Sequence, residues 1–83
     1  MDPSEGEIAL RRLAAAEEAV ARARDLAARQ REIVARLESA RHDTTHARQL
    51  LGMFETIRAN HERRRAMLLD ELTHCGWKHV TRE

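Results

Sequence analysis

The sequence predicts an all-α protein, an antiparallel two-helix hairpin that dimerises into a four-helix bundle. Three observations support this fold class. The chain has 83 residues with only three Gly and one Pro, and 14 of its residues are Ala, the strongest helix former. Apolar residues recur at helical spacing in two long segments. A short stretch between these segments, "RHDTTH" (41–46), is rich in residues that start helices.

The first helix is expected over about residues 4–41. Pro3 is favoured at a first helical position, and Ser4 and Glu7 fit a capping box. The expected inward stripe follows steps of three and four residues: Leu13, Ala16, Val20, Ala23, Ala27, Gln30, Val34 and Leu37. Its small residues leave room for long side chains from a neighbouring helix.

A turn is expected at about residues 42–44. Asp43, Thr44 and Thr45 are poor inside helices but good helix caps, which indicates a new start here. The alternative is one continuous helix of roughly 110 Å, because Arg41 and His42 stand where a left-handed Gly would normally end the first helix. The capping residues favour the hairpin.

The second helix is expected over about residues 45–75. Its stripe comprises Ala47, Leu50, Phe54, Ile57, His61, Arg64 and Leu68. Gly76 suits the position after a helix end, so Trp77 is expected to fold back on Leu72, and residues 76–83 form a short tail. A short turn makes the two helices antiparallel neighbours within a single domain, 1–83.

The apolar residues of the second helix are too many for one helix–helix contact. Left uncovered, they would form an exposed patch of the kind that marks an interface. We therefore expect a homodimer, or binding to another helical protein. The expected interface residues are Leu50, Leu51, Met53, Phe54, Ile57, Met67, Leu68, Leu69, Leu72 and Trp77.

The histidines are candidate metal ligands. His42 and His46 are four residues apart, but they flank the expected turn, and the positive end of the second helix disfavours a cation at His46. His74, Cys75 and His79 are three ligands where a zinc site needs four. No metal and no cofactor is therefore expected.

The basic segment 58–65 supplies an alternative function, a small nucleic-acid-associated regulator. Arg58, Arg63, Arg64 and Arg65 could contact phosphates. Against this, the net charge is only +1 and no aromatic platform accompanies the arginines. Acidic residues of the first helix also lie at the level of these arginines: Glu17, Glu18 and Asp25. Nucleic acid is thus an unfavoured partner.

The expected function is a non-enzymatic interaction or scaffold module that acts through homodimerisation or helix–helix binding. No phosphate loop, nucleophile motif or small-molecule pocket is evident. The absence of a membrane-length apolar run, the acidic start and the single cysteine, Cys75, predict a cytoplasmic location without membrane contact.

Over residues 28–72 the chain resembles a group of small bacterial α-helical hairpin proteins with no known activity. The elements that carry the resemblance are "RQREIVARLE", "HDT" and "ARQLLGMFE". The resemblance implies a bacterial cytoplasmic helical hairpin and transfers no functional residues.

Overall fold

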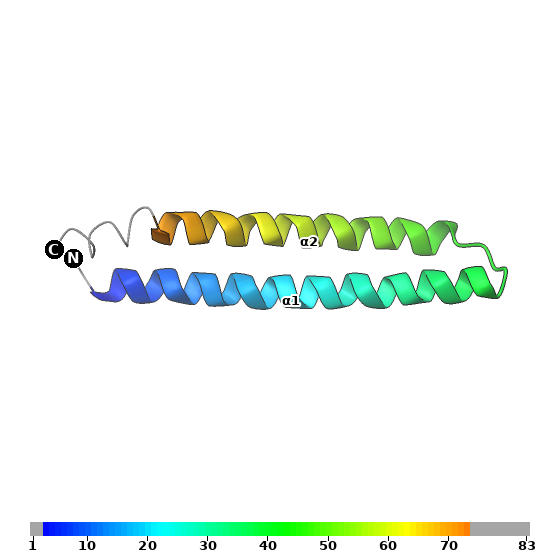
Figure 1. Cartoon of the computed structure of the whole chain (residues 1–83), viewed down its shortest axis with the longest axis horizontal. Coiled ribbons are helices and arrows are strands. Elements are labelled where there is room, and N and C mark those ends of the chain that lie inside the picture. Colours follow the sequence, from blue (N-terminus) through cyan, green and yellow to red (C-terminus); the bar gives the residue numbers. More distant parts are fainter. Residues whose placement is uncertain (1–2, 74–83) are drawn as a thin grey trace.

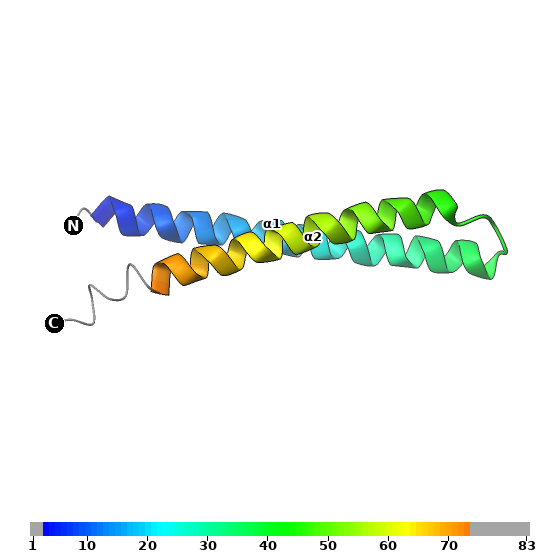
Figure 2. The same ribbon diagram turned by 90° about the horizontal axis from the view of Figure 1, so that it is seen from above.

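The fold is a long antiparallel helical hairpin. The structure, a computed structural model, describes residues 3–73. Helix α1 (Pro3–Ser39) and helix α2 (Thr45–Glu71) lie side by side along their length (Figure 1) and cross at a shallow angle (Figure 2). The predicted all-α hairpin is therefore confirmed, and the alternative of one continuous helix is wrong. The molecule measures 64 × 17 × 14 Å.

The predicted inward stripe of α1 is confirmed. Six of its eight residues are buried: Ala16, Val20, Ala23, Ala27, Gln30 and Val34. Leu13 and Leu37 at its two ends are half-buried. The steps alternate between three and four residues, which is the heptad spacing of a coiled-coil seam. Ala27 has an exposed fraction of 0%, so its methyl group is fully covered in the seam with α2.

A left-handed residue ends α1. Arg41 has φ 60°, its N–H donates to Glu38 O at 3.0 Å, and the N–H of His42 donates to Leu37 O at 2.8 Å. These two bonds form a Schellman motif with Arg41 in the position that Gly usually occupies. The helix therefore ends at Ser39, two residues before the expected boundary, and the connection covers residues 40–44.

The side chain of Asp43 starts α2. Asp43 Oδ1 accepts hydrogen bonds from the Thr45 N–H at 3.0 Å and from the Thr45 hydroxyl at 2.7 Å. These two bonds lower the pKa of the Asp43 carboxyl, with the backbone N–H as the larger cause. The Thr44 hydroxyl makes no cap bond and instead accepts from Arg48 Nε at 2.9 Å. Of the three capping residues that the sequence offers, Asp43 is the acceptor.

Five of the seven residues predicted for the inward stripe of α2 are buried or half-buried: Ala47, Leu50, Phe54, His61 and Leu68. Ile57, at 41% exposure, and Arg64 lie exposed, although both were expected to face α1. The two partly covered residues that follow them, Arg58 and Arg65, face α1 instead. Ala47 is buried, and the half-buried residues that follow it at steps of three and four are Leu51, Phe54, Arg58, His61, Arg65, Leu68 and Leu72. The prediction took Ile57 as inward because it is apolar. An arginine can take the inward position instead where its charge is paired.

Gln30 connects the helices near the turn. Its buried side chain donates from Nε2 to the Ala47 carbonyl oxygen at 3.0 Å. A buried amide with a partner avoids the cost of an unpaired polar group.

The described part of α2 closes with a wider turn at Leu72 and Thr73. The Leu72 N–H donates to both Leu68 O and Leu69 O. The expected helix stop at Gly76 and the packing of Trp77 on Leu72 lie outside the described residues. Within residues 3–73, neither helix is long and apolar enough to cross a membrane.

Candidate interaction face

The hairpin presents two different faces, one on each side of the seam between its helices. The first, which we name the charged face, carries four cross-helix ion pairs: Glu17–Arg65, Arg24–Glu62, Arg31–Glu55 and Glu38–Arg48. The α1 members of these pairs are spaced seven residues apart. They occupy one heptad position, directly beside the buried stripe.

Arg58 links two of these pairs into one network. Its guanidinium donates to Glu55 Oε2 at 2.9 Å and to Glu62 Oε1 at 2.8 Å. Glu62 also accepts from Arg24 Nε at 2.8 Å, and Glu55 also accepts from Arg31. The hydrogen bonds to Glu55 and then Glu62 raise the pKa of Arg58, and the bond from Arg24 is the main cause that lowers the pKa of Glu62. The network therefore favours the ionised form of both groups.

The charged face fixes the register of the two helices more than it stabilises them. Exposed ion pairs contribute about 0–1 kcal/mol each. However, a slip of one residue would separate all four pairs together and could bring like charges opposite one another. Because each cation of the ladder already faces a carboxylate, this side of the seam offers little positive charge to an external anion.

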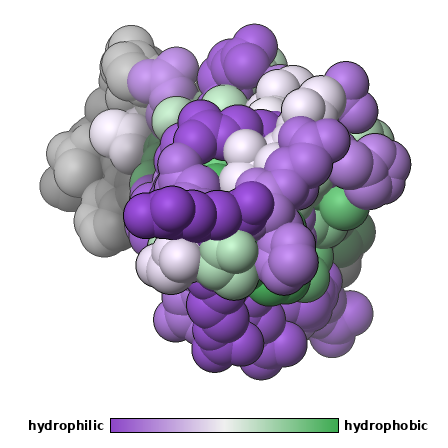
Figure 3. All heavy atoms as spheres, turned by 90° about the vertical axis from the view of Figure 1, so that its right-hand side faces the viewer, coloured by the Kyte–Doolittle hydropathy of each residue, from purple (hydrophilic) through white to green (hydrophobic). Residues whose placement is uncertain are grey.

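The opposite side of the seam, which we name the apolar face, has no comparable ion-pair ladder among the described residues. Its members are Leu26 and Ile33 of α1 and Leu50, Met53 and Ile57 of α2. Leu26, Ile33 and Met53 are 46%, 44% and 59% exposed. In the view from the turn end, a group of green apolar atoms reaches the surface at the right, among mainly purple polar atoms (Figure 3).

Seven-residue spacing places these side chains on one face. Leu26 and Ile33 each directly precede a buried residue of α1, Ala27 and Val34. Leu50 and Ile57 each precede an inward residue of α2 by one position in the same way. In an antiparallel pair these flanking positions meet on the same side of the seam, opposite the charged face.

A hollow interrupts the apolar face toward the open end of the hairpin. It is an open depression of about 200 Å³. The lining residues are Arg12, Ala15, Ala16, Ala19, His61 and Arg64. Because three of the lining side chains are methyl groups, the surface here lies lower than at Ile33 or Leu50. His61 therefore lies beside small side chains of α1.

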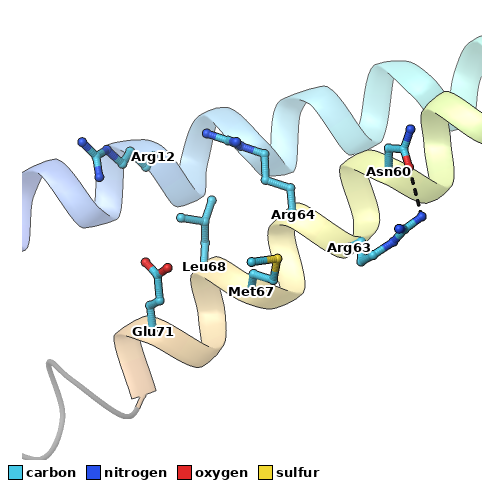
Figure 4. Close-up of a pocket in the computed structure, with 7 residues that line it drawn as sticks. All are labelled: Arg12, Asn60, Arg63, Arg64, Met67, Leu68 and Glu71. Carbon is cyan, nitrogen blue, oxygen red and sulfur yellow. Dashed lines mark hydrogen bonds between the residues drawn. The ribbon is translucent and has the colours of Figure 1, made fainter.

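A second depression, the end groove, adjoins the hollow and has a volume of about 370 Å³ (Figure 4). Its lining residues are Arg12, Asn60, Arg63, Arg64, Met67, Leu68 and Glu71. Figure 4 shows Arg64 reaching from α2 toward α1, with Leu68 pointing the same way below it. Arg63 donates to Asn60 Oδ1 at 3.0 Å, whereas Arg12 and Arg64 have no acidic partner within residues 3–73. The end groove is therefore cationic.

The structure divides the predicted interface residues into two groups. Met53, Ile57 and Met67 are exposed. The remaining described members are half-buried: Leu50, Leu51, Phe54, Leu68, Leu69 and Leu72. Trp77 lies outside the described residues. Leu26 and Ile33 are not among the predicted interface residues, which all follow the turn. Their recurrence at seven-residue intervals before buried positions is the signal that would have included them.

The four arginines of the alternative nucleic-acid site do not share one environment. Arg58 and Arg65 are engaged in the charged face. Arg63 and Arg64 are exposed and line the end groove on the other side. Of the acidic residues expected to neutralise this segment, Glu17 pairs with Arg65, while Glu18 and Asp25 pair within α1 with Arg22 and Arg29.

Within residues 3–73 no three His, Cys, Asp or Glu side chains come together as a set that could hold a metal ion. The second cluster that the sequence offers, His74, Cys75 and His79, lies outside the described residues.

Comparisons with known proteins add no relative. No family model, no curated protein and no solved structure matches the chain.

Proposed function

We propose that the chain is a non-enzymatic interaction or scaffold module that acts in the cytoplasm through helix–helix binding on its apolar face. The observation that carries the proposal is the contrast between the two faces. The charged face pairs its cations with its own carboxylates, whereas the apolar face leaves Leu26, Ile33, Met53 and Ile57 at 41–59% exposure. Covering such side chains contributes about 25 cal/mol per Å² of apolar surface removed from water.

The simplest form of this function is a homodimer that packs two hairpins into a four-helix bundle. A two-helix hairpin has no interior of its own, so its flanking apolar positions are covered only when another layer of helices is added. The same face would accept one or two helices of a different protein.

Light scattering on size-separated protein across 1–100 µM tests the homodimer. We expect a dimer for the wild type and a monomer for Ile57→Glu. Burial of an Ile side chain is worth roughly 1.5–3 kcal/mol. Because a symmetric dimer loses two such contacts, Kd should rise by more than about 100-fold.

Thr56→Glu is the matched control. It introduces the same side chain one residue earlier, at an exposed position that belongs to neither the hollow nor the apolar face. It should leave the dimer intact. A wild-type chain that is folded but monomeric throughout this range would exclude homodimerisation. In that case a pull-down with mass spectrometry should recover a helical protein that Ile57→Glu fails to bind, and recovery of the same proteins by both would overturn the proposal.

A second candidate is a small nucleic-acid-associated regulator, favoured by the cations of the end groove. Arg12, Arg63 and Arg64 gather there with Glu71 as the one acidic group of its lining. Phosphate contacts would make binding fall steeply with salt. A gel-shift titration at low salt, comparing the wild type with an Arg63→Gln and Arg64→Gln double variant, tests this candidate. Absence of binding at low salt would exclude it.

A further inference from the structure

We infer that the apolar face is self-complementary and binds a second copy of the chain in antiparallel orientation, about a two-fold axis at the level of Leu26 and Ile57. This inference rests on the proposed function and adds to it the partner, the orientation and the fit. It depends on where the protruding side chains and the hollow lie along the face.

Leu26 and Ile57 occupy the middle of the two-helix part of the molecule. On α1, Leu26 lies midway along the sequence between Arg12 and the turn residue Ala40. On α2, Ile57 lies midway between the capping residue Asp43 and Glu71. Arg12 and Glu71 line the same end groove, so they lie at the same level of the hairpin. The midpoints of the two helices, Leu26 and Ile57, therefore lie at the same level too.

The protrusions and the hollow lie at equal distances on opposite sides of this midpoint. Ile33 is seven residues beyond Leu26 toward the turn, and Ala19, in the hollow, is seven residues before it. Seven residues correspond to about 10.5 Å along a helix. The two-fold axis lies in the interface and is perpendicular to the long axis of the hairpin. It therefore places Ile33 of one copy over Ala19 of the other. By symmetry, Ile33 of the second copy fills the hollow of the first.

Helix α2 repeats this arrangement. Leu50 and Arg64 are each seven residues from Ile57, in opposite directions. The two-fold axis places Leu50 of one copy beside Arg64 of the other, where the aliphatic part of the arginine side chain can cover it while the guanidinium stays at the rim. Large side chains thus meet small or flexible ones at both levels.

The parallel orientation, with the two-fold axis along the long axis, fits less well. It would set hollow against hollow and leave a void, and unfilled space forfeits packing contacts. It would also gather the end-groove cations of both copies, Arg12, Arg63 and Arg64, at one end, whereas the antiparallel orientation places the two sets at opposite ends.

The area available matches that of a stable dimer. The 27 residues of α2 span about 40 Å, and the molecule is 17 Å wide. The projected area of the face is therefore roughly 700 Å². Its accessible area is larger than this flat projection, because the side chains protrude. Stable interfaces cover about 800 Å² per partner.

Pulsed electron–electron double resonance distances test the orientation in the full chain with Cys75→Ser and a spin label at His42→Cys. His42 lies in the turn with an exposed side chain. In the antiparallel dimer the two labels lie at opposite ends, about 45 Å apart from the 1.5 Å rise per residue. In the parallel dimer both labels lie at one end, at roughly half that distance. A short distance would overturn the inference while leaving the proposed function standing, and no intermolecular signal would overturn the homodimer itself.

The hollow has its own test and matched control. Ala15→Leu places three additional carbon atoms in the hollow at an exposed position, and Ala14→Leu adds the same atoms one residue earlier, outside it. We expect Ala15→Leu to raise the dimer Kd at least about tenfold and Ala14→Leu to leave it within about twofold. An Ala15→Leu dimer as tight as the wild type, or tighter, would show that Ile33 does not enter the hollow. Circular dichroism of both variants should show unchanged helicity.

Discussion

Replacement of Arg41 by Gly is expected to stabilise the protein, although it removes a whole side chain. Arg41 holds φ at 60° in the Schellman motif that ends α1. Its side chain is exposed and makes no ion pair with the described acidic residues, so the variant loses no contact seen in the structure. The substitution therefore isolates the backbone conformation.

The magnitude follows from two opposing terms. A residue other than Gly pays roughly 1–2 kcal/mol for the left-handed conformation, and Gly removes that cost. Gly also makes the unfolded chain more flexible, which costs about 0.4–1 kcal/mol. The net gain is about 0.5–1 kcal/mol, or roughly 3–6 °C in Tm for a chain of this size.

Thermal and urea unfolding followed by circular dichroism measure this gain, at one fixed protein concentration because dimerisation also shifts Tm. Arg36→Gly is the control, since it makes the same change within α1, where Gly costs about 1 kcal/mol. A single continuous helix would give Arg41→Gly that same destabilisation. Loss of stability in Arg41→Gly would therefore refute the left-handed turn.

Three further predictions concern the core, the cap and the charged face. Ala27→Leu should destabilise the hairpin by about 1–3 kcal/mol in urea unfolding, because Ala27 is fully buried, while Ala28→Leu on the exposed side should change stability by less than about 0.5 kcal/mol. Asp43→Ala should lower stability at neutral pH. The folded-state pKa of Asp43 lies below its unfolded value near 4, so its stabilisation is present above about pH 4 and is lost as the pH falls through the folded-state pKa. The urea midpoints of wild type and variant should therefore converge in acid, and a constant gap would contradict the cap. Reversal of one charge, Arg24→Glu, should lower Tm, and the added Glu62→Arg should restore much of the loss at low salt. Equal Tm values for the single and double variants would show that the pair is not formed.

Much of the fold is readable from the sequence. The α1 stripe is predicted residue by residue, because small apolar residues recur at inward positions and charged residues surround them. The start of α2 is predicted from Asp43 and the threonines after it, since a short acceptor side chain is the chemistry that a helix start requires.

The inward side of α2 cannot be read from apolarity in the same way. Ile57 is more apolar than Arg58, yet Arg58 faces α1, because Glu55 and Glu62 neutralise it and both also bind arginines of α1. The inward position of Arg58 in place of Ile57 therefore depends on arginine side chains of α1, which lie far from α2 in the sequence. The apolar face is likewise predicted only in part, since Leu26 and Ile33 join Ile57 only once the two helices are placed in register.

The two faces also differ in the force on which each depends. Ion pairs on the charged face are exposed enough for salt to screen them, and the Debye length falls to about 3 Å at 1 M salt. Contacts on the apolar face weaken on cooling and strengthen with excluded salts such as sulfate. Salt is therefore expected to weaken the contacts on one side of the seam, and cold is expected to weaken those on the other.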